Sequence, residues 1–325
     1  MNIGIAGRFE LHVYDEKGVL REHRPMQPNL ITDAGLIALM QGHNIAALRL
    51  GSGDNEPQKT DTQLTAPLAD ITYASASGDK DGQLYDKNGQ FYTYCVPQFR
   101  AHNTGTAAVT VKELGLLDND TNKLVTHALI KSGGAPSPIT LQPGWYLDVT
   151  YELRAYYHKA PISKDAEFTV GSDKKTYHTQ TVVWVKPDGK SLYTTPHPAN
   201  LSISSGYLYL TVHAYPSGLT ADGKPPATSG GVTVAERAPR PQDTDIVIQG
   251  DAAVADLPLI TMPEHINVSG GRVKVIGLFG GALMSHAVEF KDDAGEGIPK
   301  DELSAIDFRF RYTVSRYSGT LEERA

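Results

Sequence analysis

Residues 147–153 read Leu-Asp-Val-Thr-Tyr-Glu-Leu, a strict alternation of apolar and polar side chains. Successive side chains of a β-strand point to opposite faces, so this period of two predicts a strand with one buried face. The same alternation recurs at Phe9–Val13, Leu208–Val212 and Ile306–Tyr312. Turn sequences that end in glycine, such as Asp15–Gly18, separate the runs. The chain is therefore predicted to be mostly antiparallel β structure.

One short segment favours a helix. Thr32 or Asp33 offers a side-chain oxygen that can accept the unpaired amide hydrogens of a first helical turn. Gly42 is typical of a helix end, and Gly35 inside the segment indicates close packing at that point. An apolar stripe lies between them, formed by Ala34, Leu36, Ile37, Leu39 and Met40. We expect a helix over residues 33–41 on an all-β fold of sandwich type.

Composition excludes several classes of protein. The 325 residues carry a net charge of −7, which argues against nucleic-acid binding. No apolar run approaches the roughly 18 residues of a membrane span, so no membrane association is expected. Residues 1–8 lack a charged segment followed by an apolar one, so we expect no secretory signal. The single cysteine, Cys95, excludes an internal disulfide framework and a cysteine-based zinc cluster.

The length suggests two domains, since about 150 residues per domain is typical. The stretch from Lys159 to Lys175 is polar and contains a proline, so we place the boundary near Ala160. The predicted domains are residues 1–160 and residues 161–325.

The two halves share a sequence pattern. Three segments recur in the same order with one short deletion: Val111–Leu117 as Val273–Phe279, Leu124–Ala128 as Leu283–Ala287, and Leu147–Leu153 as Ile306–Tyr312. The pattern predicts two related β-sandwich-like units that arose by duplication. The alternative is that any two antiparallel meanders share such an alternation. With duplication, His127 and His286 occupy equivalent places, which favours packing roles for both.

Motifs of catalysis are missing from the sequence. Gly218–Pro225 is one residue from a phosphate-binding loop, but Pro225 replaces the hydroxyl that must hold magnesium. Asp118–Asn122 lacks the glycine and the closing glutamate of a calcium loop, so we interpret it as a turn. Neither a His-Glu-x-x-His helix nor a Gly-x-Ser-x-Gly elbow occurs. We expect no enzyme activity, no catalytic residue, no bound metal and no cofactor.

Tyrosines outnumber phenylalanines, 16 to 8. A tyrosine offers a large apolar area with one polar tip, which suits protein interfaces and sugar faces. The alternative is that these rings fill the core. The candidates for a ligand-binding or interface surface are Tyr156, Tyr157, Tyr207, Tyr209 and Tyr215.

One succession of motifs resembles a known family. Asn29–Leu36 reads N-L-I-T-D-A-G-L and is followed by Gly51-Ser52-Gly53, by Pro57 and by the D-T-Q-L of Asp61–Leu64. This order resembles the N-terminal region of tail and tail-fibre proteins of tailed bacteriophages. Glu113–Asp118 and Leu124–Ala128 are similar to the hairpin by which tail-collar fibre proteins fasten to the tail. Leu117 stands where that family has an aromatic residue.

The resemblance implies a structural virion protein, such as a tail or baseplate subunit or a tail-fibre adaptor. It implies other tail proteins as partners, a trimer or hexamer, and a place in the virion tail after assembly in the bacterial cytoplasm. A receptor- or carbohydrate-binding tail protein for host attachment, with a host-surface glycan as ligand, is the alternative. An enzyme acting on surface polysaccharide is a third reading that no motif supports. The expected assembly residues are Asp33, Gly35, Gly51, Gly53, Gly115 and Gly277.

Overall fold

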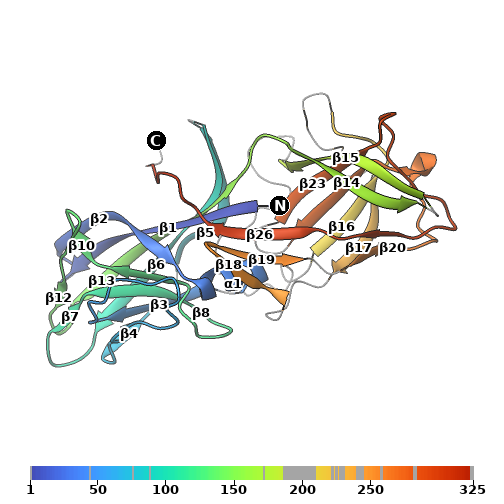
Figure 1. The fold of residues 1–325 in the computed structure, drawn as a ribbon. Helices are drawn as coiled ribbons and strands as arrows, with labels where there is room; N and C mark the ends of the chain where they lie inside the picture. Colours follow the sequence, from blue (N-terminus) through green and yellow to red (C-terminus); the bar gives the residue numbers. More distant parts are fainter. Residues whose placement is uncertain are drawn as a thin grey trace.

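The chain folds into many strands and one short α-helix, α1 (Asp33–Gln41), among the described residues (Figure 1). The predicted all-β class is confirmed. No helix in this part of the chain is long and apolar enough to cross a membrane. The computed structural model describes residues 2–43, 45–74, 77–87, 89–170, 173–185, 210–220, 223, 226, 231–238, 245–256, 259–280 and 284–322.

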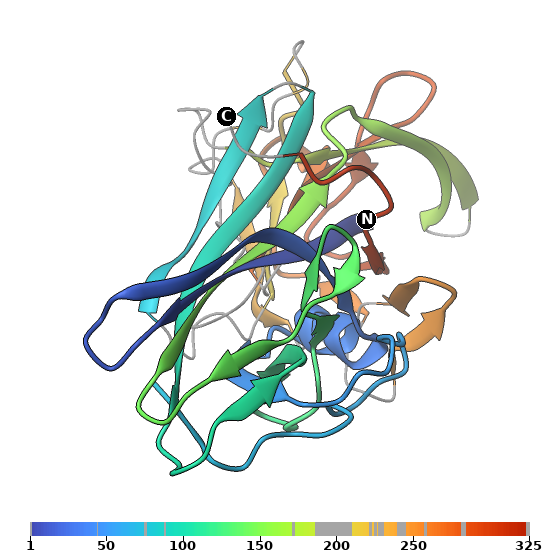
Figure 2. The same cartoon turned by 90° about the vertical axis from the view of Figure 1, so that its left-hand side faces the viewer.

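A long antiparallel sheet forms the framework of the first half. Its central strand pairs with one neighbour on each side, and the register sets Leu11 opposite Val149 and Phe9 opposite Tyr151. All four of these side chains are buried, as the alternation predicts. Figure 2 shows the long cyan hairpin of β5 and β6 at the edge of this sheet. The strands are β1 (Asn2–Tyr14), β2 (Leu20–Ile31), β13 (Tyr146–Tyr157), β6 (Gln90–Asn103), β5 (Ser77–Lys87) and β4 (Ile71–Tyr73).

A second group of strands shares one core with this sheet. It joins the sheet through Leu30 and Ile31, at the end of β2. The Thr126 hydroxyl lies 3.1 Å from the Tyr151 hydroxyl, which links the group to β13. The group comprises β3 (Ile45–Gly51), β8 (Glu113–Asp118) and β9 (Thr126–Leu129), with the short strands β7 (Val109–Val111), β10 (Lys131–Ser132), β11 (Ala135–Pro136) and β12 (Ile139–Leu141).

The second half contains a separate six-stranded antiparallel sheet. Short strand pairs β20–β25 and β21–β24 accompany it. The sheet runs in the order β14 (Ile162–Val170), β15 (Asp173–Val183), β23 (Met284–Lys291), β22 (Val275–Gly280), β16 (Leu210–Tyr215) and β17 (Val232–Ala238). The short strands are β20 (Ile260–Met262), β21 (Arg272–Val273), β24 (Ile298–Pro299) and β25 (Ile306–Phe308), with a 3-10 turn at Ser269–Gly271.

The two halves repeat the same strand order. The order β1-β2-β9-β8-β3 in the first half corresponds to β14-β15-β23-β22-β16 in the second. The short pairs also match, because Val111 faces Ile139 in one half and Val273 faces Ile298 in the other. The first two segment pairs found in the sequence thus lie on equivalent strands.

The third pair differs between the halves. Leu147–Leu153 lies within the single strand β13, whereas Ile306–Tyr312 is divided between β25 and β26 (Arg311–Arg316). β26 runs parallel to the first residues of β1 and sets Ile3 opposite Val314. On its other side β26 pairs with β19 (Ala252–Asp256), which pairs with β18 (Val247–Gln249).

The last strands of the chain therefore extend the first sheet. The expected boundary near Ala160 falls between β13 and β14, but residues 247–256 and 311–316 belong to the sheet that contains β1. The first residues of β1 explain this arrangement, because β2 pairs with β1 only from Gly7 onward. The backbone of Asn2–Ile5 needs another hydrogen-bonding partner, and β26 supplies it.

The helix predicted over residues 33–41 is confirmed at both ends. Thr32 is the N-cap, since its hydroxyl oxygen accepts the Gly35 amide at 2.9 Å. Gly42 ends the helix in the left-handed conformation with φ of 69°. The helix contacts β19 and β26, so it packs against strands from the far end of the chain.

Candidate functional site

Residues of the resembling motifs converge on one buried carboxylate, Glu113. Its oxygens accept amide hydrogens from Gly53 at 3.1 Å, Thr65 at 3.1 Å and Ala66 at 2.8 Å. The His127 Nε2 atom lies 2.9 Å from the same carboxylate. We call the set formed by Thr32, Gly35, Gly51, Gly53, Asp61, Glu113, Gly115 and His127 the motif scaffold.

His127 links Glu113 to the D-T-Q-L segment. Its Nδ1 atom lies 2.6 Å from Asp61, so each ring nitrogen faces a carboxylate. Burial alone would lower the pKa of His127, but hydrogen bonds to Glu113 and Asp61 outweigh it and raise that pKa. Burial alone would raise the pKa of Glu113, but hydrogen bonds from His127, Ala66 and Thr65 outweigh it and lower that pKa. The arrangement therefore favours the protonated form of His127 between two carboxylates.

The glycines of the scaffold allow close contacts. A Cβ atom on Gly35 would lie 2.2 Å from the Val125 carbonyl oxygen, and one on Gly115 would lie 2.1 Å from that of Thr126. At Gly51 and Gly53 a Cβ would lie 2.4 Å and 2.6 Å from the Glu113 carboxylate, which four hydrogen bonds fix in place.

Gly277 lies at the equivalent place in the second half. It is buried in β22, between His213 of β16 and Ala287 of β23. His286 follows on β23 at the position that corresponds to His127, and its surroundings differ. Burial lowers the pKa of His286 to about 3, and its Nδ1 atom has no hydrogen-bond partner among the residues that the structure describes.

Asp33, at the start of α1, forms an ion pair with Arg316 near the C-terminus. Its carboxylate lies 2.5 Å from the guanidinium of Arg316, at the end of β26. Arg316 also donates to the Ile31 carbonyl at 2.6 Å and pairs with Asp251 at 3.3 Å. This expected assembly residue is thus engaged within the chain.

Burial excludes three expected surface tyrosines from a ligand-facing role. Tyr156 and Tyr157 are buried at the end of β13, and Tyr215 is buried on β16. Tyr156 stacks on Tyr317 with ring centroids 3.6 Å apart, so the chain's own C-terminal segment covers it. The expectation of surface roles for these rings is wrong because they fill the core. Tyr207 and Tyr209 lie outside the described residues.

The exposed side of the first sheet gathers polar and aromatic side chains that the sequence reading did not select. Because Phe9, Leu11 and Val13 point into the core, the residues between them point to solvent. The register sets His12 opposite His23 on β2 and opposite Asp148 on β13. We call this surface the β1 face and define it by Glu10, His12, Tyr14, His23, Arg100, Tyr146 and Asp148.

Ion-pair and ring contacts hold the side chains of the β1 face in place. Arg100 donates to both oxygens of Asp148 at 2.6 Å and 2.7 Å, and its guanidinium lies 4.2 Å from the Tyr146 ring centroid. Hydrogen bonding to Asp148 raises the pKa of Arg100. Tyr146 stacks on Tyr14 at 5.2 Å. A groove of about 690 Å³ is lined by Tyr14, Arg100 and Asp148 together with Glu10 and His12.

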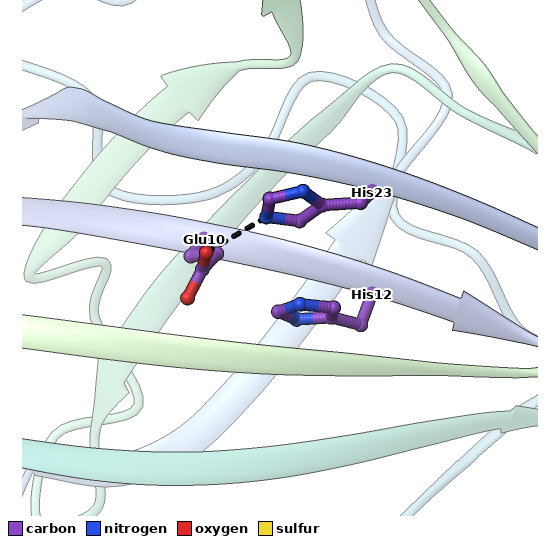
Figure 3. A group of neighbouring side chains, drawn as sticks. All are labelled: Glu10, His12 and His23. Atoms are coloured by element: carbon purple, nitrogen blue, oxygen red, sulfur yellow. Dashed lines mark hydrogen bonds and ion pairs between the residues drawn. The ribbon is translucent and has the colours of Figure 1, made fainter. Parts of the chain in front are cut away.

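Three members of the β1 face could ligate a metal. One ligand atom each from Glu10, His12 and His23 lie within 4.8 Å of one another (Figure 3). The sequence signal was present, since Glu10-x-His12 alternates on one strand and the Asp15–Gly18 turn folds His23 back beside it. Metal-ligand motifs defined by spacing within one helix miss this group, because the register of the β1–β2 hairpin brings His23 beside His12.

A second histidine–carboxylate group lies at the turn expected from residues 118–122. Asp118 accepts hydrogen bonds from the Asp120 amide, the Thr121 hydroxyl and His43. Burial alone would raise the pKa of Asp118, but these hydrogen bonds outweigh it and lower it. The group closes the turn, as the sequence interpretation holds.

A comparison of this chain with protein families, with curated proteins and with solved structures finds no match.

Proposed function

We propose that this protein is a structural component of a bacteriophage tail, such as a tail or baseplate subunit or a tail-fibre adaptor. It acts by assembly with other tail proteins and with copies of itself, as a trimer or hexamer. Its place is the virion tail, assembled in the bacterial cytoplasm.

The observation that carries the proposal is the motif scaffold. The motifs that resemble tail proteins are separated in sequence, yet Gly53 and His127 contact Glu113 through hydrogen bonds and Asp61 is linked to it through His127. Because these residues hold one another in place, we expect the motifs to occur together in one protein. Glu113 and His127 are almost fully buried and fully engaged, which favours a supporting role over a reaction with substrate.

The shared sheet adds support. β26 and β19 join the second half to β1, and Arg316 ties α1 to that junction. Backbone hydrogen bonds across the junction favour one rigid piece, which suits a protein that transmits force between larger parts.

Solution mass tests the proposal. Sedimentation equilibrium of the full chain is expected to give three or six copies, and electron microscopy is expected to show rings or bundles of matching symmetry. A single-chain mass that persists up to about 100 µM contradicts self-assembly, because mass action drives oligomers to form as concentration rises.

A receptor- or carbohydrate-binding role is the second candidate, and the β1 face favours it. Its groove combines Tyr14, which stacks on Tyr146, with the Arg100–Asp148 pair, side chains that suit the apolar faces and hydroxyls of a sugar. Glycan-array binding by the full chain, lost in Arg100→Ala and kept in the control Lys112→Ala, whose side chain pairs with Asp54 outside the groove, supports this role. An absence of binding at millimolar sugar contradicts it.

A further inference from the structure

Glu10, His12 and His23 lie together on the solvent side of the β1–β2 hairpin. Glu10 and His12 occupy alternate positions of β1, and His23 faces His12 from β2. Figure 3 shows the three side chains on one side of the hairpin, with the Glu10 carboxylate beside the two rings. The His23 Nε2 atom lies 2.8 Å from Glu10 Oε1, and the two imidazole rings stack with centroids 4.5 Å apart.

We propose that these three residues bind one divalent transition-metal ion of the zinc class. Two imidazole nitrogens and one carboxylate oxygen form a donor set that zinc and its neighbours favour. Ligand atoms about 2.0–2.2 Å from a tetrahedral ion lie about 3.4 Å from one another. The donor atoms already lie within 4.8 Å, so small side-chain rotations bring them to that spacing.

The backbone holds the three positions in place. β1 is paired with β2 on one side and with β13 on the other at His12. Beneath the face, Leu11 and Val13 are buried in the core and fix the direction in which His12 points. Binding therefore requires side-chain rotation and no change of the sheet, which keeps the ordering cost low.

The neighbouring charges leave the site available. Asp148 faces His12 across the strand pair, but Arg100 engages both of its oxygens. Glu10 bonds to His23, a contact that the ion replaces as both atoms become ligands. Three protein ligands leave one coordination position of a tetrahedral ion for water or for an oxygen atom of a molecule in the adjoining groove.

Isothermal titration of the chelator-treated full chain with Zn²⁺ tests the proposal. We expect one ion per chain, and at least about tenfold weaker binding in Glu10→Gln and His23→Gln, because each removes one ligand of three. His178→Gln is the matched control: His178 is exposed between Asp165 and Asp293 on another sheet, and its removal is expected to leave the affinity unchanged.

Thermal unfolding without metal checks that the variants fold, since substitutions of solvent-facing residues change stability little. The visible absorption of bound Co²⁺ reports the ligands directly, and His12→Gln is expected to change its intensity and position. The proposal is overturned if the titration shows no binding of Zn²⁺ to the wild-type chain. It is also overturned if His23→Gln binds as tightly as wild type, or if His43→Gln abolishes binding.

Discussion

Glu113 places a negative charge inside the first half of the molecule, where three amides and His127 surround it. We expect Glu113→Gln to lower the free energy of unfolding by about 3 kcal/mol, because it leaves the buried imidazolium of His127 without one counter-charge. Urea unfolding measures the change. Glu56→Gln is the control, since Glu56 forms an exposed pair with Lys131 nearby and its loss is expected to cost about 0.5 kcal/mol or less.

The same substitution has a pH signature. The lowered pKa of Glu113 gives stability that is present above its ordinary value of 4.5 and is lost as pH falls through the folded value. The raised pKa of His127 gives stability that is full below 6.5 and is lost as pH rises through the folded value. The difference between wild type and Glu113→Gln is thus expected to be largest between about pH 4.5 and 6.5. A difference that is constant from pH 4 to 9 contradicts the charged arrangement.

His286 is expected to act in the opposite direction. With its pKa lowered to about 3 by burial, the neutral ring is favoured on folding, so stability is lost as pH falls below 6.5. Between pH 7 and pH 5 this loss amounts to about 2 kcal/mol. We expect His286→Leu to remove that loss, as measured by urea unfolding at both pH values. His178→Gln is the control for the direction of the effect. The pKa of His178 is raised by its contacts with Asp165 and Asp293, so its removal is not expected to reduce the loss of stability at low pH.

Sequence reasoning located several residues of the motif scaffold but not their contacts. Gly35 and Gly115 were identifiable because a glycine inside a regular element signals a close approach. The contact of Glu113 with Gly53, and that of Asp61 with His127, each join a loop to a strand far away in the chain. No local pattern states which loop folds over which strand, so these contacts could not be derived.

At the scale of elements, prediction succeeded where the signal is local. The helix has its cap, apolar stripe and terminal glycine within residues 32–42, and each is found in place. The strand over 147–153 follows from its own alternation. Ile306–Tyr312 shows the same alternation but divides, because β25 pairs with β20 while β26 pairs with β19 and β1. Strand length is set by partners, which the pattern of one segment does not contain.

The matching glycines of β8 and β22 test the equivalence of the two halves. We expect Gly115→Val to lower the free energy of unfolding by more than about 3 kcal/mol, since its Cβ would overlap the Thr126 carbonyl. Gly277→Val is expected to act similarly, because β22 is a buried interior strand. Thr110→Val, on an exposed strand position, is the control. Wild-type melting of Gly277→Val would mean that the two glycines do not play equivalent roles.

At the scale of the molecule, the repeat and the junction lead to different expectations. Two copies of one strand order suggest two units that fold alone, in line with the boundary that the polar stretch from Lys159 to Lys175 predicts near Ala160. The path of β26 opposes this, because its hydrogen bonds to β1 and its contact with α1 place the chain end in the first half. A strand of the second half that pairs with the first half leaves no sequence signal, since that strand keeps its alternation.

A fragment of residues 1–160 separates these expectations. It keeps β1–β13 but loses β26, β19 and Arg316, so it exposes the backbone of Asn2–Ile5 and one side of α1. We expect it to melt at least about 5 °C below the full chain or to aggregate, because a loss of about 1 kcal/mol shifts the melting temperature of such a domain by 2–4 °C. Hydrogen exchange should locate the loss, with faster exchange in α1 and the start of β1 than in β8 and β9. A monomeric fragment with unchanged melting and exchange would show that the first half is independent of the junction.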